Sequence, residues 1–382
     1  MVKNPRITHL YLENWRNFTI VDVPLQSRVF LVGPNASGKS NWLDVFRFLQ
    51  DVTSVGGGFQ EAVRRRGGVS KLRSLAARRY PNIGIRVSIG SSDIPKLWEY
   101  ELFFTQDNRQ RPYIARERVA HNGVDILTRP DESDQNDRER LTQTYLEQVN
   151  ANQRFRDIAE FFGSVRYLHI VPALVRDPDR FDNRSNDPFG GDFLEQIART
   201  PEKTQKARLR RIRDALRVAV PQLKELELKR DTRGKPHLRG KYEHWRPQGA
   251  WQEEDQFSDG TLRLLGLLWS VLDGNGPLLL EEPEQSLHPE VVRFIPQMLA
   301  RVQRRAGRQI MVSTHSPDLL RDEGIGLDET LLLVPGSEGT SVQLAGTYRE
   351  IKILLDSGLS LSEAILPYTR PAQAPQLVLF GA

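Results

Sequence analysis

A glycine-rich segment near the amino terminus constrains the fold of this chain most strongly. Residues 33–40 read Gly-Pro-Asn-Ala-Ser-Gly-Lys-Ser, which satisfies the pattern G-x-x-x-x-G-K-[ST] in full. An apolar run over 29–32 precedes it. The segment after it carries apolar side chains at helical spacing, at Trp42, Val45, Phe46 and Leu49. A loop of this kind between a strand and a helix wraps backbone N–H groups around phosphate, so the segment predicts an α/β fold with a phosphate-binding loop.

The residue types inside this loop predict a nucleotide phosphate with a bound magnesium ion. Lys39 is expected to reach the β and γ phosphates, and Ser40 is expected to ligate Mg²⁺. A chance glycine-rich turn is the alternative, and the flanking strand and helix weigh against it. The expected nucleotide contacts are Gly33, Pro34, Asn35, Ala36, Ser37, Gly38, Lys39, Ser40 and Asn41.

A second apolar run, over 278–280, ends in two acidic residues, Glu281 and Glu282. This arrangement is typical of a Walker B strand. Glu281 is expected to hold Mg²⁺ through water, and Glu282 is expected to polarise the attacking water as general base. A strand that ends in acids is common in proteins, so this pattern carries weight only together with the glycine-rich loop.

Two shorter signals flank the Walker B strand. The segment Ser258-Asp259-Gly260-Thr261 precedes a predicted helix, where free N–H groups and a hydroxyl can bind an anion or simply cap the helix. His315 directly follows a predicted strand over 310–313, where it can hydrogen-bond a γ-phosphate or serve structure alone. Neither signal is specific by itself.

The order of these segments is that of Walker A, signature, Walker B and switch histidine in ABC-type ATPases. The chain resembles the soluble ABC-type P-loop ATPases of the RecF, SMC and OLD-like group, which includes stand-alone AAA-family ATP-binding proteins and anti-phage defence ATPases. Besides the loop at 33–41, the matching stretches are 14–18 (Asn-Trp-Arg-Asn-Phe), 257–263, 278–284, 286–289 and 314–317. The resemblance implies an ABC-type P-loop ATPase head with a β-rich N-terminal lobe, a mixed parallel sheet flanked by helices, and a mainly helical insertion.

The pattern of elements predicts four consecutive parts. Strands with turn signals fill 83–128, helical patterns occupy 141–162 and 192–219, and helix alternates with strand in the last third. The parts are an N-terminal ATPase lobe with Walker A and antiparallel strands (1–129), a mainly helical insertion lobe (130–250), a C-terminal ATPase lobe with signature, Walker B and switch histidine (251–346), and a C-terminal helix with a flexible tail (347–382).

Family likeness implies ATP with Mg²⁺ and a homodimer that closes around two nucleotides. ATP would lie between Lys39 of one subunit and the signature of the other, and hydrolysis would release the dimer. His315 would sense the γ-phosphate. The remaining implied nucleotide contacts are Arg16, Phe257, Ser258, Asp259 and Gly260. For Arg16, a surface salt bridge is the equal alternative.

The chain departs from the family pattern at two points. Glu281 stands where most ABC proteins carry aspartate, which predicts slow turnover. The Q-loop glutamine has no clear counterpart, and Gln60 is the candidate, although it can equally be an ordinary loop residue. The chain also lacks sustained heptads, so we expect a compact head without a long coiled coil.

Charge favours a nucleic-acid partner. The chain carries a net charge of +5 with a pI near 9.4. Clusters of arginine that could follow the phosphates of double-stranded DNA are Arg64, Arg65 and Arg66 after the first helix, and Arg210, Arg211, Arg213 and Arg217 on a predicted helix. Solvated helix faces and a compositional bias are the alternative explanations.

The carboxyl-terminal segment Gln376-Leu-Val-Leu-Phe380 resembles the short peptide with which bacterial proteins dock on the replication sliding clamp. A proline- and alanine-rich lead-in would let it reach a partner. The alternative is a terminal segment that packs on its own domain.

Composition narrows the class of protein. The sequence has no cysteine, no apolar run long enough to cross a bilayer and no signal-peptide pattern, which favours a cytoplasmic protein without membrane association. We therefore expect a DNA-associated ATPase of DNA repair, or the ATPase and sensor component of an anti-phage system with a separate effector protein. The alternative is an ATP-gated, non-catalytic scaffold dimer that holds or releases a partner. A transporter motor subunit is disfavoured by the form of the signature.

Overall fold

The computed structural model describes residues 4–77, 81–177, 187, 189–244, 250–370, 376 and 378. Most of the segment that resembles a clamp-binding peptide, namely Leu377, Leu379 and Phe380, lies outside the described residues, so its docking on a sliding clamp stays a prediction. No helix in the described ranges combines the length and the apolar character needed to span a membrane.

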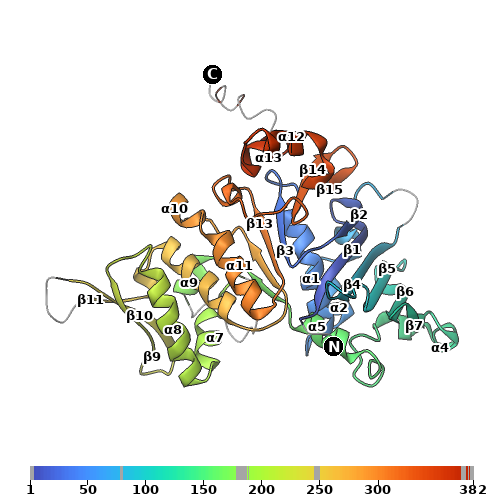
Figure 1. The fold of residues 1–382 in the computed structure, drawn as a ribbon. Helices are drawn as coiled ribbons and strands as arrows, with labels where there is room; N and C mark the ends of the chain where they lie inside the picture. Colours follow the sequence, from blue (N-terminus) through green and yellow to red (C-terminus); the bar gives the residue numbers. More distant parts are fainter. Residues whose placement is uncertain are drawn as a thin grey trace.

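An antiparallel sheet of six strands forms one end of the molecule, in the order β2-β1-β4-β5-β6-β7 (Figure 1). Along β1 and β2, buried side chains alternate with more exposed ones, whereas β4 is buried at almost every position. The strands are β1 (Arg6–Trp15), β2 (Phe18–Pro24), β4 (Ile83–Gly90), β5 (Trp98–Gln106), β6 (Pro112–His121) and β7 (Val124–Arg129).

A second six-stranded sheet lies at the centre, in the order β15-β14-β3-β13-β12-β8. All neighbours pair in parallel except β14 and β15, so the sheet is mixed. Parallel strands are covered on both faces, which is why they read as continuous apolar runs in the sequence. The strands are β3 (Arg28–Val32), β8 (Arg166–Leu168), β12 (Leu278–Glu281), β13 (Ile310–Thr314), β14 (Thr330–Gly336) and β15 (Gly339–Leu344).

Two hydrophobic cores lie on the two faces of this central sheet. Along β12, Leu279 belongs to the first core and its neighbours Leu278 and Leu280 belong to the second, because successive side chains of a strand point to opposite faces. The first core surrounds α1 (Lys39–Thr53), and the second surrounds α9 (Asp259–Leu272). The sheet therefore holds the start of α1 and the carboxyl end of β12 in fixed positions.

Short helices complete the first core. The apolar face of α5 (Arg156–Gly163) places Phe161 and Phe162 in the core around α1. The other helical segments of this lobe are α2 (Phe59–Arg65), α3 (Val69–Leu72), α4 (Glu132–Asn136) and η1 (Arg138–Thr142).

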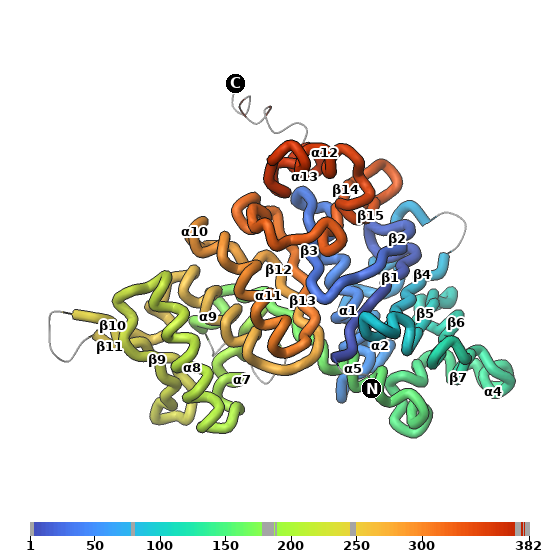
Figure 2. The backbone as a smooth tube through the Cα atoms, viewed as in Figure 1, coloured from blue at the N-terminus to red at the C-terminus, as the bar shows by residue number. Residues whose placement is uncertain are grey.

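The outer lobe packs beside α9 and away from α5 (Figures 1 and 2). It contains α7 (Phe193–Arg199), α8 (Glu202–Leu216) and a three-stranded antiparallel sheet of β9 (Leu223–Arg230), β10 (Pro236–Tyr242) and β11 (Ala250–Glu253). The segment predicted as one insertion lobe is thus distributed over three places, because α5 packs on α1 and β8 joins the central sheet. Within this segment, β9 and β10 pair antiparallel as a hairpin.

The remaining elements cover the second core and the far edge of the central sheet. Helices α12 and α13 lie beside β14 and β15 (Figure 1). These elements are α6 (Pro172–Arg176), η3 (Glu254–Gln256), α10 (Pro289–Val292), α11 (Ile295–Ala306), η4 (Leu319–Arg321), η5 (Ala345–Thr347), α12 (Arg349–Asp356) and α13 (Leu361–Thr369).

Candidate functional site

The glycine-rich loop lies between β3 and α1, as the motif predicts. Gly38 caps α1 in the left-handed conformation, with φ 96°. A Cβ atom at this position would come within 2.1 Å of the Asn17 amide, so only glycine fits. The loop therefore directs the free N–H groups at the start of α1 toward one point, which is the geometry of an anion site.

Lys39 extends across this loop. Its Nζ donates hydrogen bonds to the carbonyl oxygens of Gly33, at 2.9 Å, and Pro34, at 3.1 Å. Burial lowers the pKa of Lys39, and the acidic side chains of the Walker B region act in the opposite direction. The ammonium group thus lies inside the loop, close to three carboxylates.

Ser40 and Glu281 meet at the carboxyl edge of the central sheet. The Ser40 hydroxyl donates to one carboxylate oxygen of Glu281, and the hydroxyl of Tyr167, on β8, donates to the other. A serine hydroxyl beside a carboxylate is a donor set that suits Mg²⁺, which prefers oxygen ligands. The structure thus brings together the two residues that the sequence predicts as metal ligands.

Glu282 lies next to His315. The imidazole Nδ1 is 2.9 Å from one carboxylate oxygen of Glu282, and the Gln285 amide donates to the other. Glu282 adopts a positive φ of 43°, an uncommon conformation for a residue with a side chain, and its N–H donates to the Ser313 carbonyl at 3.0 Å. The end of β13 and the end of β12 therefore hold this acid and this histidine together.

A buried acid, Glu284, connects the segment after β12 to the end of β13. The Thr314 hydroxyl donates to Glu284 at 2.5 Å, and Glu284 is only 7% exposed. Burial raises the pKa of the Glu284 carboxyl. Sequence reasoning missed Glu284 and Gln285 as supporting residues, although Glu284 ends the matching stretch 278–284 and Gln285 directly follows it.

Asn17 braces the phosphate-binding loop. Its amide donates to the Ser37 carbonyl at 3.0 Å and to the Thr340 hydroxyl at 2.8 Å, and its carbonyl accepts from Asn41 at 2.8 Å. The side chain therefore ties the loop to β15. Its place in the stretch 14–18 was the signal that could have identified it.

Arg16 pairs with α1 rather than with the loop. Its guanidinium lies 2.9 Å from the Asp44 carboxylate, and the side chain is 27% exposed. The structure therefore contains the ion pair that was the alternative for Arg16.

Gln60 bonds to its own chain. Its side-chain amide donates to the carbonyls of Pro112, at 2.9 Å, and Thr142, at 2.8 Å, and so joins α2 to β6.

The signature segment begins α9. Ser258 caps the helix by accepting a hydrogen bond from the Thr261 N–H at 3.2 Å. Asp259 forms an ion pair with Arg176 at 2.6 Å, and the same arginine donates to the Phe257 carbonyl. Across the part of the chain that the structure describes, no hydrogen bond or ion pair joins the segment 257–261 to the loop at 33–41. The signature therefore does not take part in the phosphate loop of its own chain.

Gly260 packs against the loop after Walker B. A Cβ atom here would lie 2.5 Å from the Ser286 carbonyl oxygen, so a larger residue would displace that loop.

The two arginine clusters differ in their surroundings. Arg64 and Arg65 are exposed and pair with Glu61, whereas the Arg66 side chain is 6% exposed and pairs with Asp44 and Asp51, both at 2.8 Å. On α8 and just after it, Arg210, Arg211 and Arg217 are exposed, and Arg213 pairs with Asp214 at 2.6 Å. Arg66 thus serves the interior, while the other arginines present charge to solvent.

Comparison with known proteins places this geometry in a family. The family model described as "AAA domain, putative AbiEii toxin, Type IV TA system" matches residues 28–321. A search of curated proteins gives no significant match.

Two solved structures share the fold. One is an SmcHead bound to the C-winged helix domain of ScpA, with 14% identity and a TM-score of 0.53 over 88% of this chain and 96% of that chain. The other is an Smc head domain with an extended coiled coil, bound to the C-terminal domain of ScpA derived from Pyrococcus furiosus, with 12% identity and a TM-score of 0.54 over 92% and 99%. At such identities the likeness concerns the fold alone. The family match, however, spans most of the sequence, so the chain belongs to this AAA-domain family.

Proposed function

We propose that this protein is an ABC-type ATPase that binds and hydrolyses ATP and dimerises around two nucleotides. The observation that carries the proposal is the meeting of Lys39, Ser40 and Glu281 with the Glu282–His315 pair at one edge of the central sheet. Five groups suited to phosphate, metal and water thus gather from the start of α1 and from the carboxyl ends of β12 and β13.

The proposed chemistry follows from these positions. The loop N–H groups and Lys39 bind the β and γ phosphates, which concentrates positive charge where the transferred phosphoryl group carries negative charge. Mg²⁺, held by Ser40 and through water by Glu281, would neutralise phosphate charge. Glu282 accepts the proton of the attacking water, and His315 orients Glu282 and contacts the γ-phosphate.

The position of the signature supports a dimer. Ser258 and Gly260 lie on α9 without a bond to their own phosphate loop in the described ranges, so they are available to the nucleotide of a second subunit. In the proposed dimer, the N–H groups at the start of α9 face the γ-phosphate bound by the partner. ATP then favours the closed state, and hydrolysis favours the open state.

For the biological role we propose a cytoplasmic, DNA-associated ATPase, acting in DNA repair or as the sensor component of an anti-phage system with a separate effector. The exposed arginines of α8, with Arg64 and Arg65, support contact with the backbone of double-stranded DNA. The Smc heads of similar fold are bound to domains of ScpA, a precedent for a protein partner on such a head.

One observation favours a second candidate, an ATP-gated scaffold dimer with little hydrolysis. Both carboxylate oxygens of Glu282 are engaged, one by His315 and one by Gln285. These two contacts hold the carboxylate between His315 and Gln285, so an attacking water must approach it beside both side chains, which fits slow turnover or none.

The test compares wild type, Lys39→Ala and Glu282→Gln for ATP turnover, with and without double-stranded DNA, and for mass in solution with ATP. We expect Lys39→Ala to lose both turnover and the ATP-dependent dimer, and Glu282→Gln to lose turnover while retaining the dimer. Unchanged turnover in Glu282→Gln would refute the assigned general base. A wild type that dimerises with ATP but does not hydrolyse it would support the scaffold instead.

A further inference from the structure

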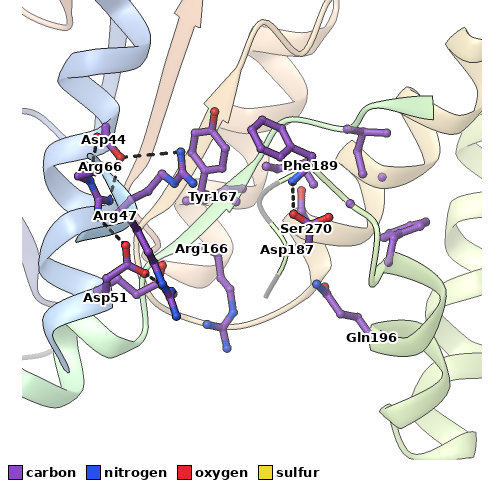
Figure 3. Close-up of a pocket in the computed structure, with 18 of the residues that line it drawn as sticks. Asp44, Arg47, Asp51, Arg66, Arg166, Tyr167, Asp187, Phe189, Gln196 and Ser270 are labelled. Carbon is purple, nitrogen blue, oxygen red and sulfur yellow. Dashed lines mark hydrogen bonds and ion pairs between the residues drawn. The ribbon is translucent and has the colours of Figure 1, made fainter. Parts of the chain in front are cut away.

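A cleft of about 1100 Å³ lies between the first lobe and the outer lobe. Helices α1 and α2 form one wall, α7 and α9 form the other, and β8 lies between them (Figure 3). This volume is at the upper end of the range for small-ligand sites, which is roughly 300–1000 Å³. It accommodates a nucleotide or a short strand, and it is too small for a double helix.

Two arginines of this cleft lack a close acidic partner. In the described part of the chain Arg166 forms no ion pair, and it donates only to the Val165 carbonyl at 3.4 Å. The nearest carboxylate of Arg47 is Asp44 at 3.8 Å, because Arg16 and Arg66 already bind Asp44 at 2.9 and 2.8 Å. Figure 3 shows Arg47 beside Tyr167 and Arg166 extending between the walls. The centre of the cleft therefore presents two guanidinium groups to an anion.

Buried donors around the cleft also lack acceptors. Trp269, which is 2% exposed, lines the cleft, and its indole N–H has no hydrogen-bond partner among the described residues. The same holds for the buried Nε of Arg16, which lines the other wall. A buried donor without an acceptor costs free energy. A ligand rich in acceptors that reaches these donors would remove this cost.

An aromatic ring completes the site. Phe189 is 42% exposed and lines the wall opposite Arg47. Its turn is fixed by Asp187, whose carboxylate accepts from the N–H groups of Phe189, at 3.3 Å, and Gly191, at 2.8 Å. An exposed ring on a braced turn, facing arginines, is the arrangement in which bases stack while phosphates pair with guanidinium groups.

We propose that this cleft binds a nucleoside phosphate, either as a free nucleotide or as part of a single strand, with phosphate on Arg47 and Arg166 and the base on Phe189. This ligand differs from the ATP of the phosphate loop. The site is separate from the exposed arginines of α8, whereas Arg64 and Arg65 lie at its wall and line the same cleft. An acidic peptide would satisfy the arginines but not the aromatic wall.

The cleft also connects with the metal-binding carboxylate. The Arg47 guanidinium lies 4.2 Å from the centre of the Tyr167 ring, and the Tyr167 hydroxyl donates to Glu281. A phosphate on Arg47 is thus separated from Glu281 by a single side chain. Resting on the proposed ATPase activity, we infer that the bound ligand changes the rate of ATP turnover through Tyr167.

Binding is tested in Lys39→Ala protein without ATP, so that the phosphate loop does not contribute. The probe is a fluorescein-labelled five-nucleotide thymidylate strand, followed by anisotropy, with unlabelled thymidine monophosphate as competitor. We expect Arg47→Ala/Arg166→Ala to weaken binding at least tenfold and Phe189→Ala to weaken it severalfold. The matched control Arg109→Ala, an exposed arginine outside the cleft and outside the basic clusters, should leave binding unchanged.

The outcomes separate the sources. Competition by the monophosphate identifies a free nucleotide, and competition by an unlabelled strand alone identifies a single strand, and both support the proposal. Equal weakening by Arg109→Ala, equal competition by a glutamate-rich peptide, or no binding by folded protein would overturn it. Arg166→Gln, which retains most of the side chain, provides the comparison if the double variant unfolds.

Coupling is measured separately as ATP turnover with and without the strand. We expect Tyr167→Phe to bind the strand normally and to lose its effect on turnover. An unchanged effect in Tyr167→Phe would overturn the coupling. Because binding is measured without ATP, a failure of the proposed ATPase activity would not be mistaken for a failure of the cleft.

Discussion

Replacing Asn17 with alanine should weaken ATP binding without unfolding the protein. Asn17 makes three side-chain hydrogen bonds, and two of them, to Ser37 and Asn41, hold the phosphate-binding loop and the start of α1. At a net value of about 1 kcal/mol for each bond, their loss removes about 2 kcal/mol of stabilisation from the ordered loop. If ATP binding must restore that order, the Kd for ATP rises roughly 30-fold.

The assay is calorimetric titration of ATP with Mg²⁺ into wild type, Asn17→Ala and Asn150→Ala, accompanied by urea unfolding of each protein. Asn150 is an exposed asparagine outside the site, so its substitution controls for the loss of an amide. Folded Asn17→Ala that binds ATP within about twofold of wild type would refute the role of these bonds, since about 0.4 kcal/mol would then be all they supply. An equal effect of Asn150→Ala would refute the assignment to this loop.

Three further changes test the fold and the dimer. Arg129 is fully buried between Glu117 and Asp134. Arg129→Met should lower the free energy of unfolding in urea by about 3–5 kcal/mol, because two buried acids lose their partner. A loss below about 1 kcal/mol would contradict this. Burial acts to raise the pKa of Asp134, but hydrogen bonds from Arg129 and others outweigh it and lower the pKa to about 2. Since this folded-state pKa lies below the usual value of 3.8, the ionised carboxylate stabilises the fold above about pH 4, and this stabilisation is lost as the pH falls toward 2. The free energy of unfolding, measured from pH 5 downward, should therefore decline less steeply in Asp134→Asn than in wild type. Gly260→Ala should abolish the ATP-dependent dimer, because the added Cβ would lie 2.5 Å from the Ser286 carbonyl oxygen. Light scattering measures the dimer, and normal dimerisation would show that the dimer does not need glycine at this position.

The parts of the site that sequence could predict are those fixed by local chemistry. The phosphate loop needs glycine at position 38 because the backbone there is left-handed, and it needs lysine at 39 because phosphate is negatively charged. The convergence of Glu281, Glu282 and His315 also follows from sequence, since neighbouring parallel strands end at one edge of a sheet. The fold class could therefore be predicted from four short motifs and their order.

The parts that could not be predicted depend on which distant segments become neighbours. Tyr167 reaches Glu281 only because β8 pairs with β12, and a three-residue strand carries little sequence signal. The burial of Arg66 has a similar origin: its sequence resembles an exposed basic cluster, but the fold places it against Asp44 and Asp51. Gln60 was a candidate for the nucleotide site because the sequence does not show its carbonyl partners, which come from segments far along the chain.

The neighbours of Glu281 give a reason for glutamate where most ABC proteins carry aspartate. A glutamate is one methylene longer than the aspartate usual at this position, and here its two oxygens reach Ser40 on one side and Tyr167 on the other. An aspartate on the same strand would end short of at least one of these hydroxyls. Tyr167 in turn lies under Arg47 of the cleft. The longer acid therefore joins the start of α1 to the edge strand of the sheet, so that the choice of glutamate links the proposed metal site to the cleft.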